Sequence, residues 1–273
     1  MRLSIRHSTR YSFGQPVSHA LQRIRLIPKE TQGQTIIDWH MEYQNAEVEL
    51  QYEDQNCNTV TLISVEPGAD SVSIICRGEV DTQDYAGVIG KHSGHLPLWS
   101  FLAQTGMTRP GPKVRSLISG LPPVDDDRLA YLHALSDAIR SRVAYETGRT
   151  GPQTTAEESA SSGFGVCQDH SHIFIGAARQ ANIPARYVSG YLMMNDRIDQ
   201  EATHAWAEAH IDGLGWVGFD ISNGISPDPR YVRVATGRDY RDAAPVTGIT
   251  FGSSEQVLHV DVAVEQQQVD QQQ

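Results

Sequence analysis

The first eighty residues alternate apolar and polar side chains, and this pattern most constrains the fold. Apolar residues occupy every second position over residues 37–43, 48–52, 60–62 and 72–76. A period of two is typical of strands that bury one face. Turn-like segments such as residues 66–68 separate these runs. The pattern therefore predicts successive antiparallel strands in a small β-sandwich or barrel.

The character of the chain changes after the predicted strands. Residues 85–124 are dense in glycine and proline, which is typical of a connector, and residues 98–103 predict one short helix within it. Three aspartates at residues 125–127 then precede apolar residues at helical spacing from Leu129 to Val143. This arrangement predicts a helix with acids at its electropositive end.

Helices and strands are mixed in the remaining sequence. A capping signal at residues 154–158 predicts a short helix, and a longer helix is predicted from Cys167 to Ala181, with Pro184 soon after its end. The Asp-Gly-Leu-Gly run at residues 212–215 predicts a hairpin. Strands are predicted over residues 185–193, 203–211, 216–219 and 257–264.

Taken together, these signals predict an α+β chain whose N-terminal part is an antiparallel β-sandwich-like domain. The predicted divisions are a β-domain at residues 1–84, a connector at 85–124, a core at 125–265 and a disordered polar tail at 266–273.

The charge balance narrows the function classes. The chain has 22 basic and 33 acidic residues, so its net charge is −11. Such a balance argues against nucleic-acid binding through a general basic surface and against a polybasic membrane contact. No apolar stretch approaches the ~18 residues of a transmembrane helix, and residues 1–13 lack the apolar block of a signal peptide. We therefore expect a cytoplasmic protein that binds neither nucleic acid nor membrane.

The chain has only three cysteines, and an odd number cannot all pair, so a disulfide framework is not expected. Cys57 and Cys76 fall on predicted strands, where a buried and inert thiol is the expected role. Cys167 opens a predicted helix behind a glycine-flanked segment that ends at Val166. There, free backbone N–H groups and the helix dipole favour the thiolate and can stabilise an oxyanion.

A nucleophilic cysteine needs a base and a group that orients the base. His204 begins one predicted strand, and Asp220 ends the next strand of the predicted hairpin. Antiparallel pairing brings the two side chains near each other. Taken singly, His204 is also compatible with a core histidine and Asp220 with an acid that starts a turn.

Three motifs resemble those of the bacterial transglutaminase-like family: GVCQDH at residues 165–170, THAWAE at 203–208 and GWVGFD at 215–220. The resemblance continues through residues 183–192 and 237–248, and residues 6–28 are similar to the N-terminal β-region of bacterial members. It covers nearly the whole chain before the tail. Residues 221–224 depart from the Pro-Thr pair that many members have after the aspartate.

The resemblance implies a papain-like core in which the nucleophile helix packs on an antiparallel sheet. It also implies that Cys167 is the nucleophile, His204 the general base and acid, and Asp220 the group that orients the imidazole. The implied reaction is acyl transfer through a thioester on a peptide or carboxamide. Either hydrolysis, as in a cysteine protease or amidase, or transfer to an amine would follow.

Five further residues are candidates for a supporting role around this triad. Asp169 and Val166 flank Cys167, and we expect the helix dipole to favour the acid. Trp206 and Glu208 share the strand face of His204, so we expect Trp206 to shield the triad and Glu208 to pair with a buried base. Tyr145 could line the cleft, although a core position is the simpler interpretation.

A metal centre is the alternative interpretation of the histidine-rich region around Cys167. His170 and His172 lie two residues apart on a helix and so point to different faces. No Cys-x-x-Cys or His-Glu-x-x-His spacing occurs, and the run at residues 125–127 is not a calcium-binding loop. The sequence therefore predicts no metal and no cofactor.

Two functions of different classes stay open: a cysteine-dependent hydrolase or acyltransferase, and a catalytically inactive transglutaminase-like binding or scaffold protein. The expected partner is a peptide, a protein or a small amide. The N-terminal β-domain could serve as a lid, a docking surface or the contact of a homo-oligomer.

Overall fold

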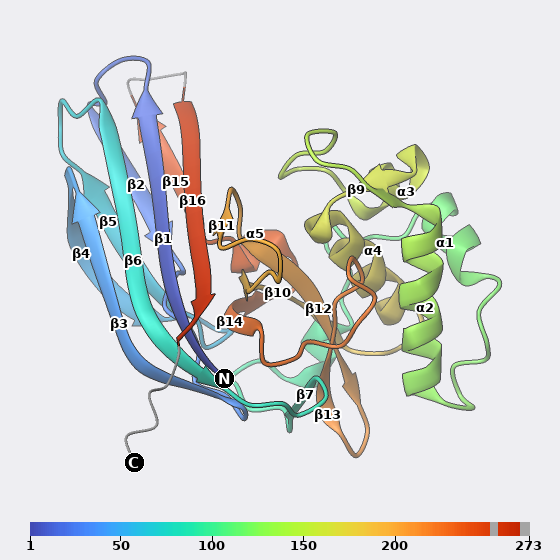
Figure 1. Ribbon diagram of the computed structural model, residues 1–273. Helices are drawn as coiled ribbons and strands as arrows, with labels where there is room; N and C mark the ends of the chain where they lie inside the picture. The colour runs from blue at the N-terminus through green and yellow to red at the C-terminus, as the bar shows by residue number, and fades with distance from the viewer. Residues whose placement is uncertain (252–255, 268–273) are drawn as a thin grey trace, which may run out of the picture.

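The computed structural model describes residues 1–251 and 256–267. Most of the polar tail expected at residues 266–273 lies outside them. The chain forms two packed sheets at one side, a third sheet in the middle and a group of helices at the other side (Figure 1). The predicted α+β class, with its N-terminal sandwich and its helix on an antiparallel sheet, is confirmed.

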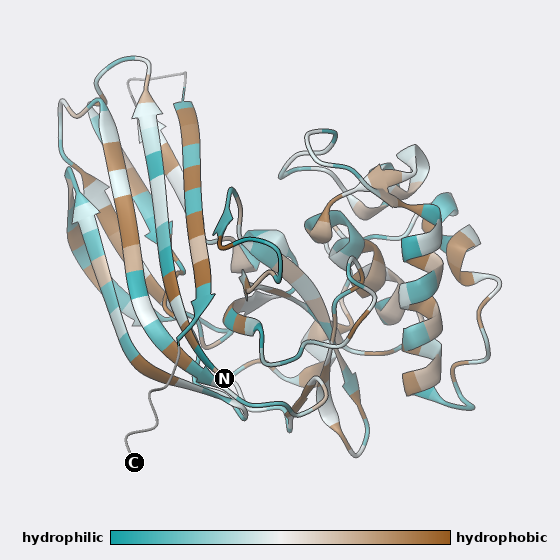
Figure 2. Cartoon of the chain, in the orientation of Figure 1, coloured by the Kyte–Doolittle hydropathy of each residue, from teal (hydrophilic) through white to brown (hydrophobic). Residues whose placement is uncertain are grey.

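We call the two packed sheets the sandwich; their strand orders are β11-β16-β1-β6-β3 and β15-β2-β5-β4. Their bounds are β1 (Arg2–Phe13), β2 (His19–Ile24), β3 (Gln34–Gln44), β4 (Ala46–Glu53), β5 (Thr59–Val65), β6 (Ser71–Thr82), β11 (Asp199–Gln200), β15 (Val246–Phe251) and β16 (Gln256–Gln266). Bands of high and low hydropathy alternate along these strands (Figure 2). Ile24, Ile63 and Ile74 lie in the core between the sheets.

The sandwich contains strands from both ends of the chain. β16 pairs antiparallel with β1 along its whole length, and β15 pairs with β2. In Figure 1 the last strand of the chain lies beside the first. β15 and nearly all of β16 lie in the region predicted as the catalytic core, residues 125–265, yet they complete the two N-terminal sheets. The strand predicted at residues 257–264 is β16.

One part of the alternating pattern was wrongly interpreted as a buried face. Val48, Leu50 and Tyr52 are 52%, 46% and 40% exposed, and Ile37 is 45% exposed. β4 is the last strand of its sheet, and nearly all of it is exposed on both faces. β4 therefore has alternating apolar and polar residues, but neither of its faces is buried by the opposite sheet.

The two cysteines expected on strands differ. Cys76 lies on β6 and is fully buried, as predicted. Cys57 is instead half-buried in the turn between β4 and β5, with a φ of 57°. Its strand prediction was wrong because the turn begins after Glu53, at Asp54, whose carboxylate accepts hydrogen bonds from the turn backbone.

The third, central sheet has the order β14-β10-β12-β13-β7. Its strands are β7 (Val88–Gly90), β10 (Ala185–Leu192), β12 (His204–Ile211), β13 (Gly215–Phe219) and β14 (Tyr231–Gly237). Every residue of β10, β13 and β14 is buried. A sheet buried in this way is covered on both faces, here by the helices on one side and the sandwich on the other (Figure 1).

The helices are η1 (Leu98–Phe101), α1 (Pro112–Ile118), α2 (Arg128–Arg142), α3 (Ala156–Ser162), α4 (Cys167–Gln180) and α5 (Tyr240–Ala243), and β8 (Ala144–Tyr145) pairs with β9 (Phe164–Gly165) between them. The helix at α1 lies in the segment interpreted as a connector. α4 packs against the small side chains of Ala205, Ala207 and Ala209 on β12. Alanine on this face lets the helix approach the sheet closely, which brings its N-terminus beside the start of β12.

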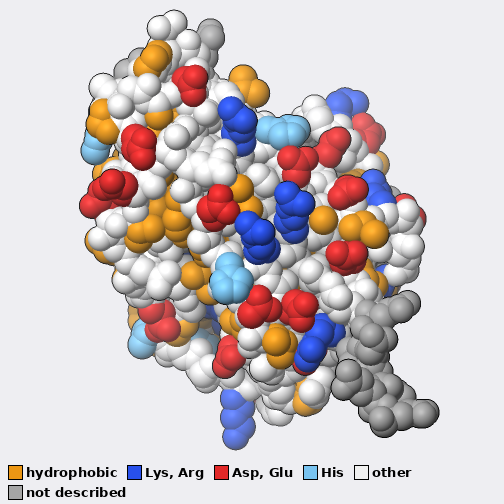
Figure 3. Space-filling model, turned by 60° about the vertical axis from the view of Figure 1, so that its left-hand side comes forward, with side chains coloured by type: hydrophobic (Ala, Val, Ile, Leu, Met, Phe, Trp, Pro, Cys, Tyr) orange, Lys and Arg blue, Asp and Glu red, His pale blue; other side chains and the backbone are white. Residues whose placement is uncertain are grey.

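Acidic and basic side chains are interspersed over the face seen in Figure 3. The acidic residues that give the net charge of −11 thus do not form one acidic patch on that face. In the described residues, no helix is both long and apolar enough to cross a membrane.

Candidate active site

Cys167 is the first residue of α4, as the sequence predicted. α3 ends at Gly163, which has a φ of 76°, and the chain turns through β9 into α4. A Cβ at Gly165 would lie 2.7 Å from Cβ of Asp169, so only glycine fits this turn. The thiol is therefore held at a helix N-terminus, where backbone N–H groups point outward without helical partners.

The buried side chain of Asp169 caps the N-terminus of α4. Its Oδ2 accepts hydrogen bonds from Val166 N at 2.8 Å and from Thr150 Oγ1 at 2.7 Å. The side chain is 1% exposed, and burial raises its pKa although both hydrogen bonds act in the opposite direction. Asp169 thus fits the expected role of an acid at the positive end of the helix.

His204 and Asp220 meet across the hairpin. His204 Nε2 lies 2.6 Å from Asp220 Oδ2, and both side chains are buried. The residues lie at the start of β12 and directly after β13, and these strands pair antiparallel. Since Nε2 is engaged by the carboxylate, Nδ1 is the ring nitrogen left for the thiol.

Electrostatics around His204 favour its protonated form. Burial alone lowers its pKa, but hydrogen bonds to Asp220 and Cys167 and the charges of both groups raise the pKa to about 10. The influence of Cys167 on this pKa indicates that its side chain lies near the imidazole. The structure thus pairs His204 with Asp220 and places the start of α4, which carries Cys167, near the ring.

Asp220 has two further partners that the sequence analysis did not name. Asn223 Nδ2 donates to Asp220 Oδ2 at 2.7 Å, and the Tyr231 hydroxyl donates to the same oxygen at 2.7 Å. Burial opposes ionisation of Asp220, yet these bonds and His204 lower its pKa. The turn signal at Ser222-Asn223-Gly224 could have indicated Asn223, whereas Tyr231 is close only through the pairing of β14.

Tyr145 lies beside His170 near the start of α4 and not in the core. Its side chain is 53% exposed, and its ring meets His170 edge-on. Burial of its hydroxyl and the nearby charges of Cys167 and Asp220 raise its pKa to about 12, and a hydrogen bond to Cys167 acts in the same direction. The core interpretation is wrong, because β8 pairs with β9 and so carries Tyr145 past the start of α4.

Trp206 and Glu208 follow His204 along one face of β12. The indole of Trp206 stacks beside the imidazole, with ring centroids 6.2 Å apart, and is 2% exposed. Glu208 is fully buried and pairs with two bases, Arg186 at 2.6 Å and Arg233 at 2.7 Å. Trp206 thus excludes water from one side of His204, and Glu208 belongs to a separate ion cluster.

The neighbouring histidines are engaged in other hydrogen bonds. His170 lies 2.9 Å from Ser222 Oγ and 3.1 Å from Val143 O. His172 is fully buried and accepts from Tyr240 N at 3.1 Å. As predicted, they point to different sides of α4: His170 toward the segment after Asp220 and His172 toward α5. Neither joins His204 around a common point.

Comparisons with known proteins agree with this architecture. Residues 120–221 match the model of the transglutaminase-like superfamily, and residues 3–81 match that of the bacterial transglutaminase-like N-terminal region. A crystal structure from Cytophaga hutchinsonii, named a "Putative Cysteine Protease", has a TM-score of 0.74 and 24% identity, and the match covers 98% of this chain and 92% of that one. At this identity the likeness concerns the fold.

Relatives of similar sequence occur in mycobacteria. An uncharacterized protein of Mycobacterium leprae is 27% identical over 97% of this chain and 98% of its own length. An uncharacterized protein of Mycobacterium tuberculosis is 36% identical over 49% of this chain and 46% of its own. The matched motifs, both matched regions and the shared fold lead to one conclusion: the chain belongs to the transglutaminase-like superfamily, with the bacterial N-terminal region of that family.

Proposed function

We propose that the protein catalyses acyl transfer through a thioester at Cys167, on a peptide or carboxamide substrate. The 2.6 Å hydrogen bond between His204 Nε2 and Asp220 Oδ2, made beside a thiol at a helix start, carries this proposal. A buried carboxylate that fixes the ring and leaves its second nitrogen facing a nucleophile is the arrangement of a hydrolytic triad.

In the first step Cys167 attacks the carbonyl carbon as the thiolate, with its proton held on His204, and the carbonyl electrons move to oxygen. Backbone N–H groups at the start of α4 are placed to stabilise that oxyanion. The C–N bond then breaks as His204 gives its proton to the leaving nitrogen. This leaves an acyl group on sulfur and a neutral imidazole. The raised pKa of His204, about 10, keeps that proton on the ring at neutral pH until the substrate nitrogen takes it.

In the second step an acceptor attacks the thioester carbon while the neutral imidazole of His204 takes its proton. The C–S bond then breaks, and Cys167 leaves as the thiolate beside the protonated ring. Water as the acceptor gives hydrolysis, and an amine gives a new amide bond. Positioned acid–base help of this kind contributes about 10²–10⁴-fold to such steps. We favour water as the acceptor, so the proposed activity is that of a cysteine protease or amidase.

An activated ester tests the acyl-enzyme without knowledge of the natural substrate. With p-nitrophenyl acetate we expect a burst of nitrophenol and one acetyl group on the peptide that contains Cys167, detected by mass spectrometry. Cys167→Ala should lose both signals, and Cys76→Ala, which removes a buried thiol, serves as the matched control. A catalytically inactive scaffold would show neither a burst nor faster alkylation of Cys167 by iodoacetamide than of Cys57.

The choice of acceptor is tested by adding a primary amine to the same reaction. If the amide accumulates faster than acetate at millimolar amine, transfer to amines replaces hydrolysis as the activity. If acetate dominates throughout, the hydrolase assignment holds.

A further inference from the structure

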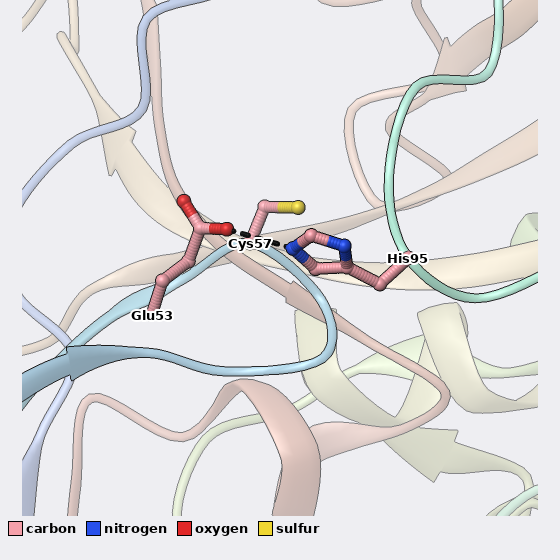
Figure 4. A group of neighbouring side chains, drawn as sticks. All are labelled: Glu53, Cys57 and His95. Carbon is pink, nitrogen blue, oxygen red and sulfur yellow. Dashed lines mark hydrogen bonds and ion pairs between the residues drawn. The ribbon is translucent and has the colours of Figure 1, made fainter.

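Away from the triad, three side chains with metal-ligand chemistry converge on one point. The ligand atoms of Glu53, Cys57 and His95 all lie within 4.8 Å of one another, and His95 Nε2 is 3.0 Å from Glu53 Oε1. Figure 4 shows the thiol, the imidazole and the carboxylate gathered between two loops. These residues come from the end of β4, the β4–β5 turn and the segment after β7.

The β4–β5 turn is rigid before any ligand binds. Cys57 N donates to Asp54 O at 2.9 Å, and Asp54 N donates to Asn58 O at 3.0 Å. The Asp54 carboxylate accepts from Asn58 N at 3.0 Å and pairs with Arg25. Cys57 itself adopts a φ of 57°, a conformation that non-glycine residues rarely take. The turn thus holds the thiol in one direction.

The loop that carries His95 is also held in place. His92 Nε2 lies 2.6 Å from Leu96 O, and Trp216 Nε1 donates to His92 Nδ1 at 3.1 Å. A Cβ on Gly94 would lie 3.7 Å from Cys57 Sγ, so the thiol faces this loop at the glycine. Two separately anchored loops therefore present their polar groups to each other.

We propose that Glu53, Cys57 and His95 form a Zn²⁺ site, with water as the fourth ligand. A thiolate, an imidazole and a carboxylate are the donors that zinc takes in tetrahedral sites, and three protein ligands leave one position open. Glu53 and His95 have side-chain exposures of 58% and 70%, so water reaches that position. Zinc requires each ligand atom at ~2.0–2.3 Å from the ion, so the three side chains would close around it on binding. Binding releases the thiol proton to solvent.

Lys29 also holds the β4–β5 turn: its Nζ donates to the backbone oxygen of Asn56, the residue before Cys57.

The site would join the sandwich to the central sheet. Asn58 Nδ2 donates to Thr236 O, and Thr236 N donates to Asn58 Oδ1, which ties the turn to β14. On the other side, His92 ties its loop to Trp216 of β13. A zinc ion between the loops would therefore brace β14 and β13, which lie on opposite sides of β12 and its His204 in the central sheet. This inference does not depend on acyl transfer at Cys167.

Cobalt titration of the chelator-treated full chain tests the site. We expect one Co²⁺ per chain with a thiolate-to-cobalt charge-transfer band, which one equivalent of Zn²⁺ displaces. Cys57→Ser should lose the band, and His95→Gln should weaken Zn²⁺ binding by at least about 10-fold. His95 is exposed, so its replacement leaves the fold intact.

Two control variants separate this site from other metal binding. His259→Gln removes an exposed histidine that also pairs with an acid, Asp261 at 3.2 Å, but no thiol. Cys167→Ser removes the thiol at the start of α4. Both should keep the band and the stoichiometry. No binding by the unaltered chain, equal binding by Cys57→Ser, or a band that disappears with Cys167→Ser would overturn the proposal.

Discussion

Asp220 and Glu208 are buried carboxylates at the same face of β12, but their hydrogen-bond partners differ. Asp220 binds His204, which lies near Cys167. Glu208 binds Arg186 and Arg233, and the Arg186 guanidinium also lies 3.9 Å from the centre of the Trp216 ring. In the proposed mechanism the first pair acts on the substrate through its imidazole, whereas the second consists of three buried charged groups that serve each other. Burial and ion pairing alone therefore do not distinguish a reactive carboxylate from a structural one.

The largest expected effect is on turnover at the first of these carboxylates. Asp220→Asn keeps the size of the side chain but removes the charge that orients His204 and stabilises its protonated form. We expect kcat to fall by about 10³–10⁴-fold with little change in KM. Steady-state kinetics with the ester measure this. Asp228→Asn, in the same segment but paired with Arg230, is the matched control. Equal losses in both variants would contradict the assigned role.

Glu208→Gln should instead affect folding. It leaves Arg186 and Arg233 buried without their counter-charge, which costs about 3–5 kcal/mol of the free energy of unfolding. Urea denaturation followed by circular dichroism gives that free energy. The turnover per folded molecule should stay near that of the parent chain. A catalytic loss larger than the loss of folded protein would show that the two clusters are not independent.

Stability should respond to pH in opposite directions at the two clusters. Burial opposes ionisation of Glu208, but Arg186 and Arg233 lower its pKa from 4.5 to about 2. Its contribution is present above pH 4.5 and is lost as the pH falls toward about 2. His204 has a pKa raised from 6.5 to about 10, so its contribution is present below pH 6.5 and is lost as the pH rises toward about 10.

Melting temperatures across this range test the two windows. Glu208→Gln should flatten only the acid limb, and His204→Gln only the alkaline limb. If either variant changes the opposite limb, the pKa direction assigned to that group is wrong.

The smallest expected effect concerns the supports of Asp220. Asn223→Ala and Tyr231→Phe each remove one hydrogen bond to Asp220 Oδ2. We expect kcat to fall by about 10-fold in each, because a hydrogen bond to a charged group is worth roughly 1.5–3 kcal/mol and the remaining partners compensate in part. Unchanged kinetics in both variants would mean that His204 alone holds the carboxylate.

Local signals predicted the centre of the candidate site well. The helix start at Cys167, the strand at His204 and the turn before β13 each depend on a few adjacent residues, and the structure has all three. The same local reasoning left Tyr145 open between the cleft and the core. Tyr145 is exposed near the start of α4 because β8 pairs with β9, and no short pattern in a two-residue strand encodes that pairing.

The sequence by itself determined the succession of strands and the capped helices, and it indicated Cys167, His204 and Asp220 as the candidate site residues. Periodicity, capping and turn chemistry act over a few residues, so they can be read from adjacent letters. The tertiary structure alone decided that β15 and β16 complete the N-terminal sheets, that β4 stays uncovered, and that Glu53 and Cys57 meet His95. These features depend on which surfaces, far apart in the sequence, bury each other. Burial of this kind is set by the packing of the whole chain and not by a few adjacent residues.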